Sequence, residues 1–394
     1  MQRLSKIPNL YLKRWFHCTG ALNSFKFADL KVEKSSKKTP PIPSDPSKLG
    51  FGKYYSAHMI DIDWDSKSGW FNPKIHPYQS ITVDPAAKVL HYAMTCFEGF
   101  KAYYGVDGNI RMFRPELNME RMKRSARRSA FPDFDVKESL LLVDELIRMD
   151  SQYIPKTDQA SLYLRPFMFA TEPQIGLSES LQVKWACFGT VAGSYFNYEK
   201  GIRLLADPEA VRSWKGGVGQ YKMGCNYAPT IQIGKMAALQ QCDQVMWLSG
   251  EDRQVTEAGA MNLFMLWTNE ENELELITPP TDGLILPGIT RMSLLELARE
   301  LNLMKVSEKS FTMSQLSRAI QQNRVHEFFT SGTAAVVGPV SEIVHVDKEN
   351  GISETLVVPT LESKYQLHQK LRKSLEDIFY GRVEKSEWQR VVEL

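Results

Sequence analysis

The sequence contains few cysteines, and none of them are arranged as a C-x-x-C pair. The five thiols belong to Cys18, Cys96, Cys187, Cys225 and Cys242. Scattered cysteines of this kind are typical of a reducing compartment and argue against a disulfide framework. A chain of 394 residues can also bury a large core without disulfide or metal staples. We therefore expect free thiols and no metal site.

The sequence also lacks long apolar runs and a strong net charge. No stretch of about 18 consecutive apolar residues occurs, which argues against a transmembrane helix. The formal net charge is only +2, so no broad basic field points to a nucleic acid or an acidic partner. The length favours two or three domains or lobes. We therefore expect a globular protein that binds neither nucleic acid nor membrane.

Acidic residues are absent from the first 28 positions, where five basic residues alternate with apolar ones. A basic, acid-free, partly amphipathic start is typical of a mitochondrial transit peptide, whereas a secretory signal needs an unbroken apolar run. Residues 14–19, RWFHCT, also resemble the R-x-F-x-x-S/T pattern of leaders processed in the matrix. We expect a mitochondrial matrix protein. The alternative is a basic tail without a targeting function, which would leave the protein cytoplasmic.

The composition changes along the chain and suggests its domain organisation. Charge, serine and proline are concentrated in residues 31–49, which predicts a linker that cannot pack. A Pro- and Gly-containing stretch at 170–180 predicts a loop between two lobes, with the active site between them. We expect a transit peptide at 1–23, a flexible linker at 24–49, a small α/β domain at 50–170, a connection at 171–197 and a large domain at 198–394.

Hydrophobic periodicity predicts a mixed α/β (α+β) fold. Short apolar runs predict strands at 89–92, 161–165, 182–188, 245–248, 261–267 and 274–278. Apolar residues at helical spacing predict helices at 139–149, 230–241, 291–301 and 364–379. Gly381 provides a stop signal for the last of these helices.

The most unusual stretch is at residues 214–229, which read WKGGVGQYKMGCNYAP. Its four glycines within eleven residues let the main chain approach a ligand closely. A lysine held in a dry site of this kind has a nucleophilic amine, which Schiff-base enzymes require. Taken alone, Lys222 is more readily explained as a solvated loop lysine.

Three further motifs carry polar groups that suit a phosphorylated cofactor. Glu257 precedes an apolar strand, where a buried carboxylate needs a partner such as a protonated ring nitrogen. Gly288 precedes a helix whose free amides can bind a phosphate, and residues 330–334, TSGTA, offer amides at a strand end. Taken singly, these motifs also fit a strand-edge turn, a helix cap by Thr290 and a glycine turn.

Together the motifs resemble those of the branched-chain aminotransferases. In the family's order and spacing, the chain contains LHYAMTCFEGFKAY, FRPELNMERM, SLYLRP, GGVGQYKMGCNY, TEAGAMNLF, ILPGITR and SGTAA. The resemblance covers roughly Gly50 to the C-terminus. It implies a fold-type IV enzyme that depends on pyridoxal 5′-phosphate (PLP), with a smaller α/β domain and a larger pseudo-barrel domain. It also implies a homodimer with both sites near the interface.

The resemblance assigns a cofactor site residue by residue. Lys222 matches the lysine that forms a Schiff base with PLP and then moves the substrate proton. Glu257 matches the carboxylate that faces the ring nitrogen, and Tyr227 matches the tyrosine that hydrogen-bonds the ring 3′-oxygen. The residues expected to bind the phosphate are Arg121, Ile289, Thr290 and Thr333.

The resemblance also implies a pocket for a branched side chain. The positions expected to line it are Phe51, Tyr92, Phe97, Tyr163 and Ala260. Leu177 matches a residue that reaches the neighbouring subunit's pocket, and Thr333 and Ala334 match a turn whose amides hold the substrate α-carboxylate. Arg165 matches an arginine that accepts the second carboxylate of glutamate, which an apolar wall alone would reject.

The implied reaction is a reversible ping-pong transamination. L-leucine, L-isoleucine or L-valine leaves as a branched 2-oxo acid, and 2-oxoglutarate then becomes L-glutamate. The sequence departs from the family pattern in three places. Residues 335–338 read AVVG where vertebrate relatives carry C-x-x-C, so a thiol switch is absent there. Ala260 replaces a threonine, and Cys225 replaces a glycine three residues after Lys222.

Two alternatives compete with this interpretation. A D-amino-acid aminotransferase or an aminodeoxychorismate lyase of the same fold shares the lysine and the glutamate, but lacks the full LHY(x)4FEGxKAY and SLYxRP patterns. A catalytically silent PLP-binding protein is the second alternative. It is disfavoured because a protein selected only for binding need not keep Lys222 and Glu257 together.

Overall fold

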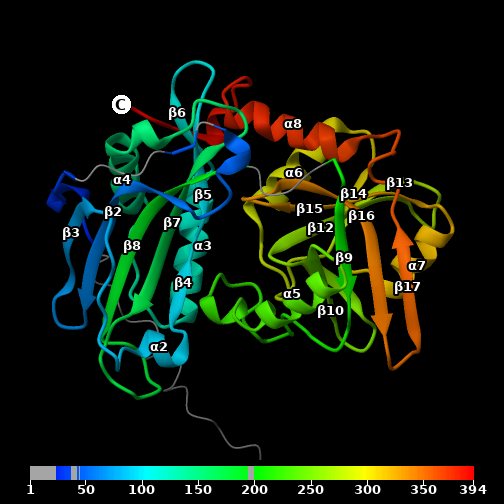
Figure 1. Cartoon of the computed structure of the whole chain (residues 1–394), viewed down its shortest axis with the longest axis horizontal. Coiled ribbons are helices and arrows are strands. Elements are labelled where there is room, and N and C mark those ends of the chain that lie inside the picture. Colours follow the sequence, from blue (N-terminus) through cyan, green and yellow to red (C-terminus); the bar gives the residue numbers. More distant parts are fainter. Residues whose placement is uncertain (1–23, 37–41, 44, 194–198) are drawn as a thin grey trace, which may run out of the picture.

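The computed structural model describes residues 24–36, 42–43, 45–193 and 199–394, so the expected leader lies outside the described residues. The described chain forms two lobes that lie side by side, each built around its own sheet (Figure 1). No helix in this part of the chain is long and apolar enough to cross a membrane.

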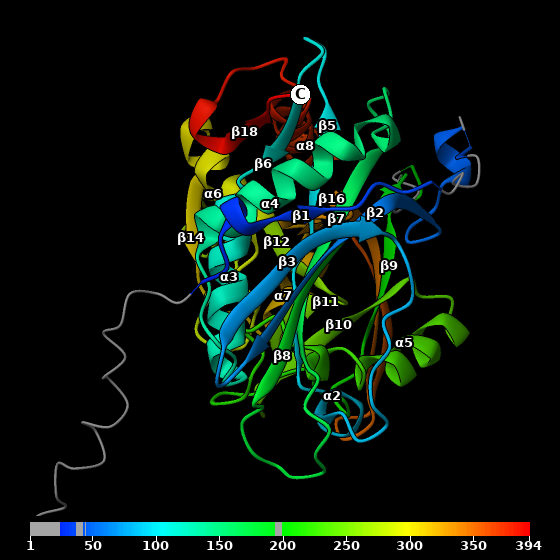
Figure 2. The ribbon, with the colours of Figure 1, turned by 90° about the vertical axis from the view of Figure 1, so that its left-hand side faces the viewer.

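The first lobe contains a mixed sheet of nine described strands in the order β1-β3-β2-β8-β7-β5-β6-β18, with β4 paired to β7. The strands are β1 (Lys31–Val32), β2 (Tyr54–Asp65), β3 (Gly69–Pro77), β4 (Thr95–Phe97), β5 (Phe100–Tyr104), β6 (Ile110–Phe113), β7 (Ser161–Ala170), β8 (Gln182–Ala192) and β18 (Gln389–Val392). Its helices are α2 (Lys88–Tyr92), α3 (Pro115–Arg128) and α4 (Val136–Met149). Figure 2 shows α3 and α4 beside this sheet.

Helix α4 illustrates why these residues form these elements. Asp135 caps its first turn by accepting hydrogen bonds from the amides of Lys137 and Glu138. Its apolar stripe, which includes Leu142 and Val143, is buried in the core of the first lobe. Helix and sheet therefore share one apolar core, which fixes the strands that lead to the site.

The second lobe also contains nine described strands, in the order β11-β10-β9-β16-β15-β12-β13-β14, with β17 paired to β16. They are β9 (Ile202–Ala206), β10 (Gln244–Ser249), β11 (Gln254–Ala258), β12 (Met261–Thr268), β13 (Leu274–Thr278), β14 (Lys305–Glu308), β15 (Val325–Gly332), β16 (Val336–Asp347) and β17 (Ile352–Val357). An additional pairing of β11 with β12 closes six of these strands into a ring. This ring is the expected pseudo-barrel.

The helices of the second lobe lie outside the ring of strands (Figure 1). They are α5 (Thr230–Leu239), α6 (Ile289–Leu301), α7 (Met313–Gln321) and α8 (Leu367–Phe379). Helices α6 and α8 share an apolar core with β12 and β15, to which Leu294, Leu371 and Phe329 contribute. Short 3₁₀ helices occur at η1 (Phe27–Asp29), η2 (Pro46–Lys48), η3 (Ser151–Tyr153), η4 (Gly224–Asn226) and η5 (Ser386–Trp388).

Most of the predicted elements are confirmed within a few residues at their ends. The strands predicted at 161–165, 182–188, 245–248, 261–267 and 274–278 are β7, β8, β10, β12 and β13. The helices predicted at 139–149, 230–241, 291–301 and 364–379 are α4, α5, α6 and α8. The strand predicted at 89–92 is wrong, because these residues form α2. Its apolar run was too short for periodicity to separate strand from helix, and Leu90 is 58% exposed.

The segment before Gly50 is more ordered than a flexible linker. β1 pairs in parallel with β3. The ring of Phe25 is 2% exposed and contacts the rings of Trp70 and Phe134. The expectation of a linker from residue 24 is therefore wrong for the residues around Phe25 and β1, because their tertiary partners are not visible in the polar local composition.

Most of the stretch 171–197, which we expect to connect the lobes, instead lies within the first lobe. Residues 171–181 join β7 to β8, which are antiparallel neighbours in the first sheet. The chain leaves this sheet only after Ala192, and it returns when β18 pairs with β6. The first lobe therefore extends beyond residue 170, and the second lobe ends before β18. Long antiparallel pairing of this kind leaves no signature in local composition.

Candidate active site

A cavity of about 360 Å³ lies where residues from both lobes meet. The Gly-rich stretch, the start of α6 and the turn between β15 and β16 all contribute to its wall. Most of the expected site residues line it, namely Phe51, Phe97, Arg121, Tyr163, Arg165, Lys222, Tyr227, Ala260, Ile289, Thr290, Thr333 and Ala334. Motifs separated by more than 200 residues in sequence are thus brought to one site.

Lys222 is held against the cavity by its main chain and by aromatic rings. Its amide donates to the hydroxyl of Ser125 at 2.9 Å, and its carbonyl accepts from the amide of Phe97 at 3.1 Å. Its ammonium nitrogen donates to the hydroxyl of Tyr227 at 3.3 Å and lies 4.9 Å from the ring centroid of Phe97. The amine is therefore half-buried and anchored at its base, with Tyr227 as its polar neighbour.

Arg121 reaches the cavity from α3 and is paired with a buried glutamate. Its Nε and Nη2 donate to the two carboxylate oxygens of Glu98 at 2.6 and 2.9 Å, and its Nη1 donates to the carbonyl of Pro287 at 3.1 Å. Burial alone would raise the pKa of Glu98, but Arg121 holds it below its ordinary value. This arrangement fixes a guanidinium group beside the start of α6.

Helix α6 begins at the cavity without a side-chain cap. Its N-cap residue is Gly288, and Ile289 and Thr290 follow as the first helical residues. A Cβ at position 288 would lie 2.1 Å from the side-chain oxygen of Asn262, so only glycine allows this close approach. The start of α6 thus offers a positive helix end and backbone amides to an anion. Thr290 is not the helix cap.

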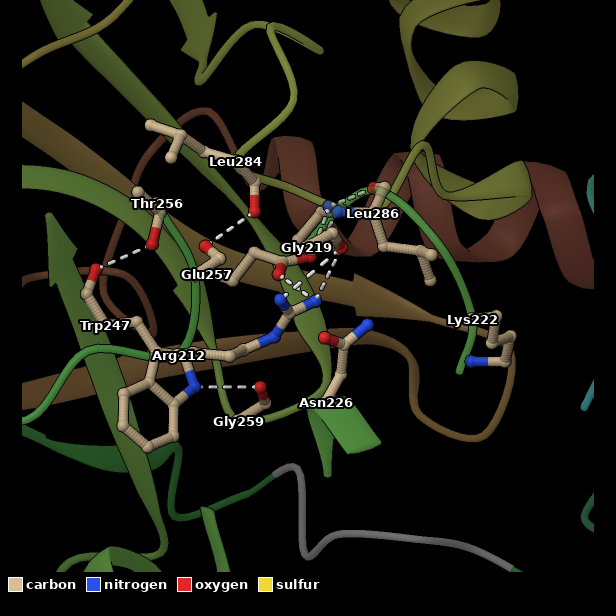
Figure 3. Close-up of polar contacts among 12 residues, drawn as sticks. Arg212, Gly219, Lys222, Asn226, Trp247, Thr256, Glu257, Gly259, Leu284 and Leu286 are labelled. Atoms are coloured by element: carbon tan, nitrogen blue, oxygen red, sulfur yellow. Dashed lines mark hydrogen bonds and ion pairs between the residues drawn. The ribbon is translucent and has the colours of Figure 1, made fainter. Parts of the chain in front are cut away.

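Glu257 lies in β11 behind the cavity wall and is 2% exposed. Its Oε1 accepts hydrogen bonds from the amide of Leu286 and from Asn262, both at 3.1 Å. Its Oε2 is 2.7 Å from Nη2 of Arg212 but accepts no hydrogen bond of good geometry. Burial raises the pKa of Glu257 above its ordinary value, while Arg212 opposes this rise. Figure 3 shows Arg212 turned toward Glu257 and Gly219.

The turn between β15 and β16 closes another part of the wall. Thr333, Ala334 and Ala335 form this turn and line the cavity. The ammonium group of Lys101 donates to the carbonyl of Ala334 at 3.0 Å. Burial lowers the pKa of Lys101 to about 8, although Glu376 acts in the opposite direction. Lys101 thus ties the turn to the first lobe.

An aromatic wall surrounds the guanidinium group of Arg165 in β7. This group lies 4.8 Å from the ring centroid of Phe97 and 5.4 Å from that of Tyr163. Its Nη2 donates to the hydroxyl of Tyr163 at 3.3 Å, whereas its buried Nε makes no hydrogen bond. Phe51 packs edge-on against Tyr163 at 4.9 Å. This side of the cavity can contact apolar groups and still offers one cationic group.

Three of the expected residues do not line the cavity of the chain. Glu257 lies just behind it and contacts Asn262 and Leu286 of its wall. Tyr92 is in α2, and Leu177 is 84% exposed on the 171–181 loop. The last two residues lie on neighbouring segments, because Ala87, directly before α2, forms a β-bridge with Pro173 of the loop.

Sequence reasoning missed several residues that shape the site. Glu98, Arg212 and Asn262 hold Arg121 or Glu257, and Lys101 holds the turn at Ala334. Glu98, Lys101 and Asn262 are all within the quoted motifs, so their charge or polarity among apolar neighbours was the available signal. Arg212 gave no local signal, because its partner Glu257 is 45 positions away in the sequence.

The comparisons with known proteins agree on one family. The protein-family model described as amino-transferase class IV matches residues 95–343 of this chain. The cytosolic branched-chain-amino-acid aminotransferase of Caenorhabditis elegans is 47% identical over 372 residues, which is 93% of this chain and 89% of that protein. The mitochondrial branched-chain-amino-acid aminotransferase of Rattus norvegicus is 45% identical over 362 residues, with 91% and 90% covered.

Solved structures have the same fold. The branched-chain aminotransferase of the archaeon Thermoproteus uzoniensis, solved with norvaline, aligns with a TM-score of 0.68 and 25% identity, covering 85% of this chain and all of that one. The Thermobaculum terrenum enzyme, solved in its PLP form, aligns with a TM-score of 0.68 and 19% identity over 86% of this chain and 99% of that one. The second likeness shows the fold alone. The expected fold class is confirmed, and the chain belongs to the class IV aminotransferases and, among them, to the branched-chain-amino-acid aminotransferase family.

Proposed function

We propose that this chain transfers the amino group of L-leucine, L-isoleucine or L-valine to 2-oxoglutarate, with PLP as its cofactor. The observation that carries the proposal is the content of the cavity. One space of about 360 Å³ presents the amine of Lys222 and the guanidinium group of Arg121, with the carboxylate of Glu257 directly behind its wall. An amine, an anion site and a buried carboxylate are the groups that PLP chemistry requires.

The residues present fit PLP. Glu257 keeps a buried oxygen, Oε2, that accepts no hydrogen bond, and a protonated ring nitrogen would donate to it. Arg121, Ile289, Thr290 and Thr333 would hold the phosphate, and Tyr227 would bind the ring oxygen. When bound, PLP supplies an electron sink for the carbanion that forms at the substrate Cα.

Lys222 is the residue that we assign to proton transfer. Its amine would hold the cofactor covalently and, after its displacement, would take the proton from the substrate Cα. The hydrogen bond to Tyr227 and the rings around the amine restrict where it can move. Its main chain, fixed by Ser125 and Phe97, keeps the amine at the reaction centre through this displacement.

The wall of the cavity suits both partners of the exchange. Phe51, Phe97 and Tyr163 offer apolar surface to a branched side chain. The amides of the 333–335 turn are suited to the α-carboxylate that both amino acids share. Arg165, whose Nε lacks a partner, would bind the second carboxylate of glutamate or 2-oxoglutarate.

We further propose a homodimer that functions in the mitochondrial matrix. The homodimer explains why Leu177 is 84% exposed although the family resemblance assigns it to a substrate pocket. The basic, acid-free start of the sequence supports the matrix location. Relatives that are named cytosolic and mitochondrial both match at 45–47% identity, so their names do not decide between these locations.

A paired measurement on the wild type and Lys222→Ala tests the proposed function. The visible absorbance of the lysine-bound cofactor is recorded first, and glutamate formation from L-leucine and 2-oxoglutarate is followed next. Lys215→Ala is the matched control, because Lys215 belongs to the same Gly-rich stretch but is exposed and, within the described part of the chain, pairs only with Asp282 at 3.6 Å. We expect activity and the visible band in the wild type and in the control, and neither in Lys222→Ala.

Other outcomes separate the alternatives. Turnover of D-alanine in place of L-leucine would indicate a D-amino-acid aminotransferase. A wild type that binds PLP and turns over no amino acid would indicate a catalytically silent binding protein. Activity that survives in Lys222→Ala would remove Lys222 from the mechanism.

A further inference from the structure

The 171–181 loop presents apolar side chains to solvent but is fastened tightly at its base. Ile175 and Leu177 are 69% and 84% exposed at its tip. Ordering a loop costs conformational entropy, and a tip exposed to solvent makes few contacts that could offset this cost. The loop therefore needs an anchor to hold one conformation. Its anchor is the first residue of α2, Lys88.

Lys88 is fully buried, and its ammonium group contacts only this loop among the contacts that the structure describes. Its Nζ lies 2.7 Å from Oε2 of Glu172 and donates to the hydroxyl of Ser178 at 2.9 Å and to the carbonyl of Glu179 at 2.8 Å. A lysine ammonium group has three donors, and acceptors on this one loop, among them also the carbonyl of Ser178 at 3.5 Å, use all of them. The two ends of the loop are thereby drawn to a single charge.

Glu172 and the backbone complete the fastening. Oε2 of Glu172 also accepts a hydrogen bond from the amide of Leu181, at the far end of the loop, at 2.9 Å. The amide of Lys88 donates to the carbonyl of Glu172 at 3.1 Å, and Ala87 forms a β-bridge with Pro173. Helix α2 and the 171–181 loop therefore form one unit, which we call the α2–loop unit.

The α2–loop unit carries the two expected substrate residues that do not line the cavity of their own chain, Tyr92 and Leu177. A buried charge is costly unless its partners surround it, so a lysine in this place constrains the loop strongly. We propose that Lys88 is a positioning residue that fixes the α2–loop unit for the substrate pocket of a second copy of this chain. This inference rests on the proposed function, because it requires a pocket that a neighbouring subunit completes.

The proposal predicts an effect on substrate affinity rather than on the chemical step. Lys88→Met keeps the length of the side chain but removes the charge that holds Glu172. We expect KM for L-leucine to rise about tenfold while kcat changes by less than about threefold, because the lost constraint acts on substrate binding. The visible band of the bound cofactor should not change. Lys88→Arg should recover most of the affinity, and Lys67→Met, at an exposed hairpin lysine, should have no effect.

Hybrid dimers test whether Lys88 acts on the neighbouring pocket. Subunits with Lys88→Met and subunits with Lys222→Ala are co-expressed with different tags, and the hybrid is isolated through both tags. In this hybrid, the cavity with an intact Lys222 belongs to the Lys88→Met subunit. The loop that completes this cavity belongs to the Lys222→Ala subunit, whose Lys88 is intact. We expect the hybrid to have the wild-type KM per active cavity. A KM that stays raised in the hybrid would overturn the action across subunits.

Hydrogen exchange separates this inference from the proposed function. In Lys88→Met we expect faster amide exchange in 171–181 and unchanged exchange in the strands β7 and β8. Unchanged exchange in the loop would overturn the role of Lys88, whatever the activity. If the wild type showed no transamination while the loop still loosened in Lys88→Met, the anchor would stand but its assignment to a substrate pocket would fall with the proposed function. A Lys88→Met variant that loses the cofactor band, with a lowered kcat as well as a raised KM, would indicate a merely structural role and would overturn the proposal.

Discussion

Arg121 and Glu98 form a buried ion pair with two hydrogen bonds, of 2.6 and 2.9 Å, at the wall of the cavity. Asn118 also donates to Glu98, at 2.8 Å, so the carboxylate is held on several sides. Glu98 thereby holds the positive guanidinium group of Arg121 at the place where the start of α6 also attracts an anion. Phosphate bound there would take over part of the neutralisation that Glu98 provides.

We therefore predict that Glu98→Gln lowers stability most when no phosphate is bound. The uncompensated charge of Arg121 should reduce the free energy of unfolding by about 3 kcal/mol. Adding PLP or inorganic phosphate should then raise the Tm of Glu98→Gln more than that of the wild type, because the anion replaces the missing charge. Thermal unfolding with and without the anion measures both effects. Glu120→Gln, on the exposed face of α3, is the control, and equal Tm gains in the variant and the wild type would remove Arg121 from the phosphate site.

Arg165 should discriminate between the two substrates of the exchange. Its guanidinium group lies beside aromatic rings and keeps a buried Nε without a hydrogen-bond partner. We predict that Arg165→Met raises KM for 2-oxoglutarate at least about tenfold, because a carboxylate in an apolar wall loses its charge partner. KM for L-leucine should change by less than about threefold. Steady-state kinetics of both half-reactions measure this, and equal losses for both substrates would contradict the assignment.

Much of the site could be predicted because its residues lie in compact motifs. Lys222 stands among glycines, and Glu257 is an acidic residue within an apolar stretch. Both are chemically conspicuous in the sequence itself. The structure places Lys222 at the cavity and Glu257 directly behind its wall, and one partner of Glu257, Arg212, lies outside every quoted motif. Arg212, in the segment between β9 and α5, contacts Glu257 of β11, and this pairing depends on topology rather than on local sequence.

The errors have a common physical origin in long-range contacts. The run at 89–92 is predicted to be a strand, yet it forms part of α2, whose first residue, Lys88, is buried by a loop about 90 residues away in the sequence. The stretch 170–180 is predicted to lie between the lobes, yet β7 and β8 pair in the first sheet on either side of the 171–181 loop. Local composition marks turns well, but it cannot say which strands a turn connects.

Lys101 gives the stability of the protein a specific pH dependence. Burial lowers its pKa to about 8 in the folded protein, from 10.5 in the unfolded chain. Between these values the unfolded state holds a proton that the folded state has released, so stability rises with pH. The wild type should therefore gain stability relative to Lys101→Met across this window, by up to about 1.4 kcal/mol per pH unit.

Urea unfolding of the wild type, Lys101→Met and Lys67→Met would measure this dependence at pH values of about 7.5, 8.5 and 9.5. These values begin just below the pKa of Lys101 in the folded protein and rise above it. The difference between the wild type and Lys101→Met should grow with pH. The difference between the wild type and the exposed control should stay constant. A constant difference for Lys101→Met as well would show that Lys101 keeps its proton in the folded protein.

The described cysteines predict a weak response to thiol oxidants. Cys96 and Cys187 are fully buried, and burial raises the pKa of both thiols well above their ordinary value. Burial also raises the pKa of Cys225, which is half-buried three residues after Lys222. Because the thiolate is the reactive form, none of these three thiols should react quickly near neutral pH. Residues 335–338, AVVG, provide no further thiol beside the cavity.

We therefore expect hydrogen peroxide or a disulfide reagent to reduce transamination only slowly, and Cys225→Ala to be inactivated no more slowly than the wild type. The measurement is residual activity against time of exposure, followed by treatment with dithiothreitol. Rapid inhibition that dithiothreitol reverses would contradict the prediction. If Cys225→Ala abolished that rapid phase, the thiol next to the Gly-rich stretch would be its source, because oxidation there would displace the main chain that anchors Lys222.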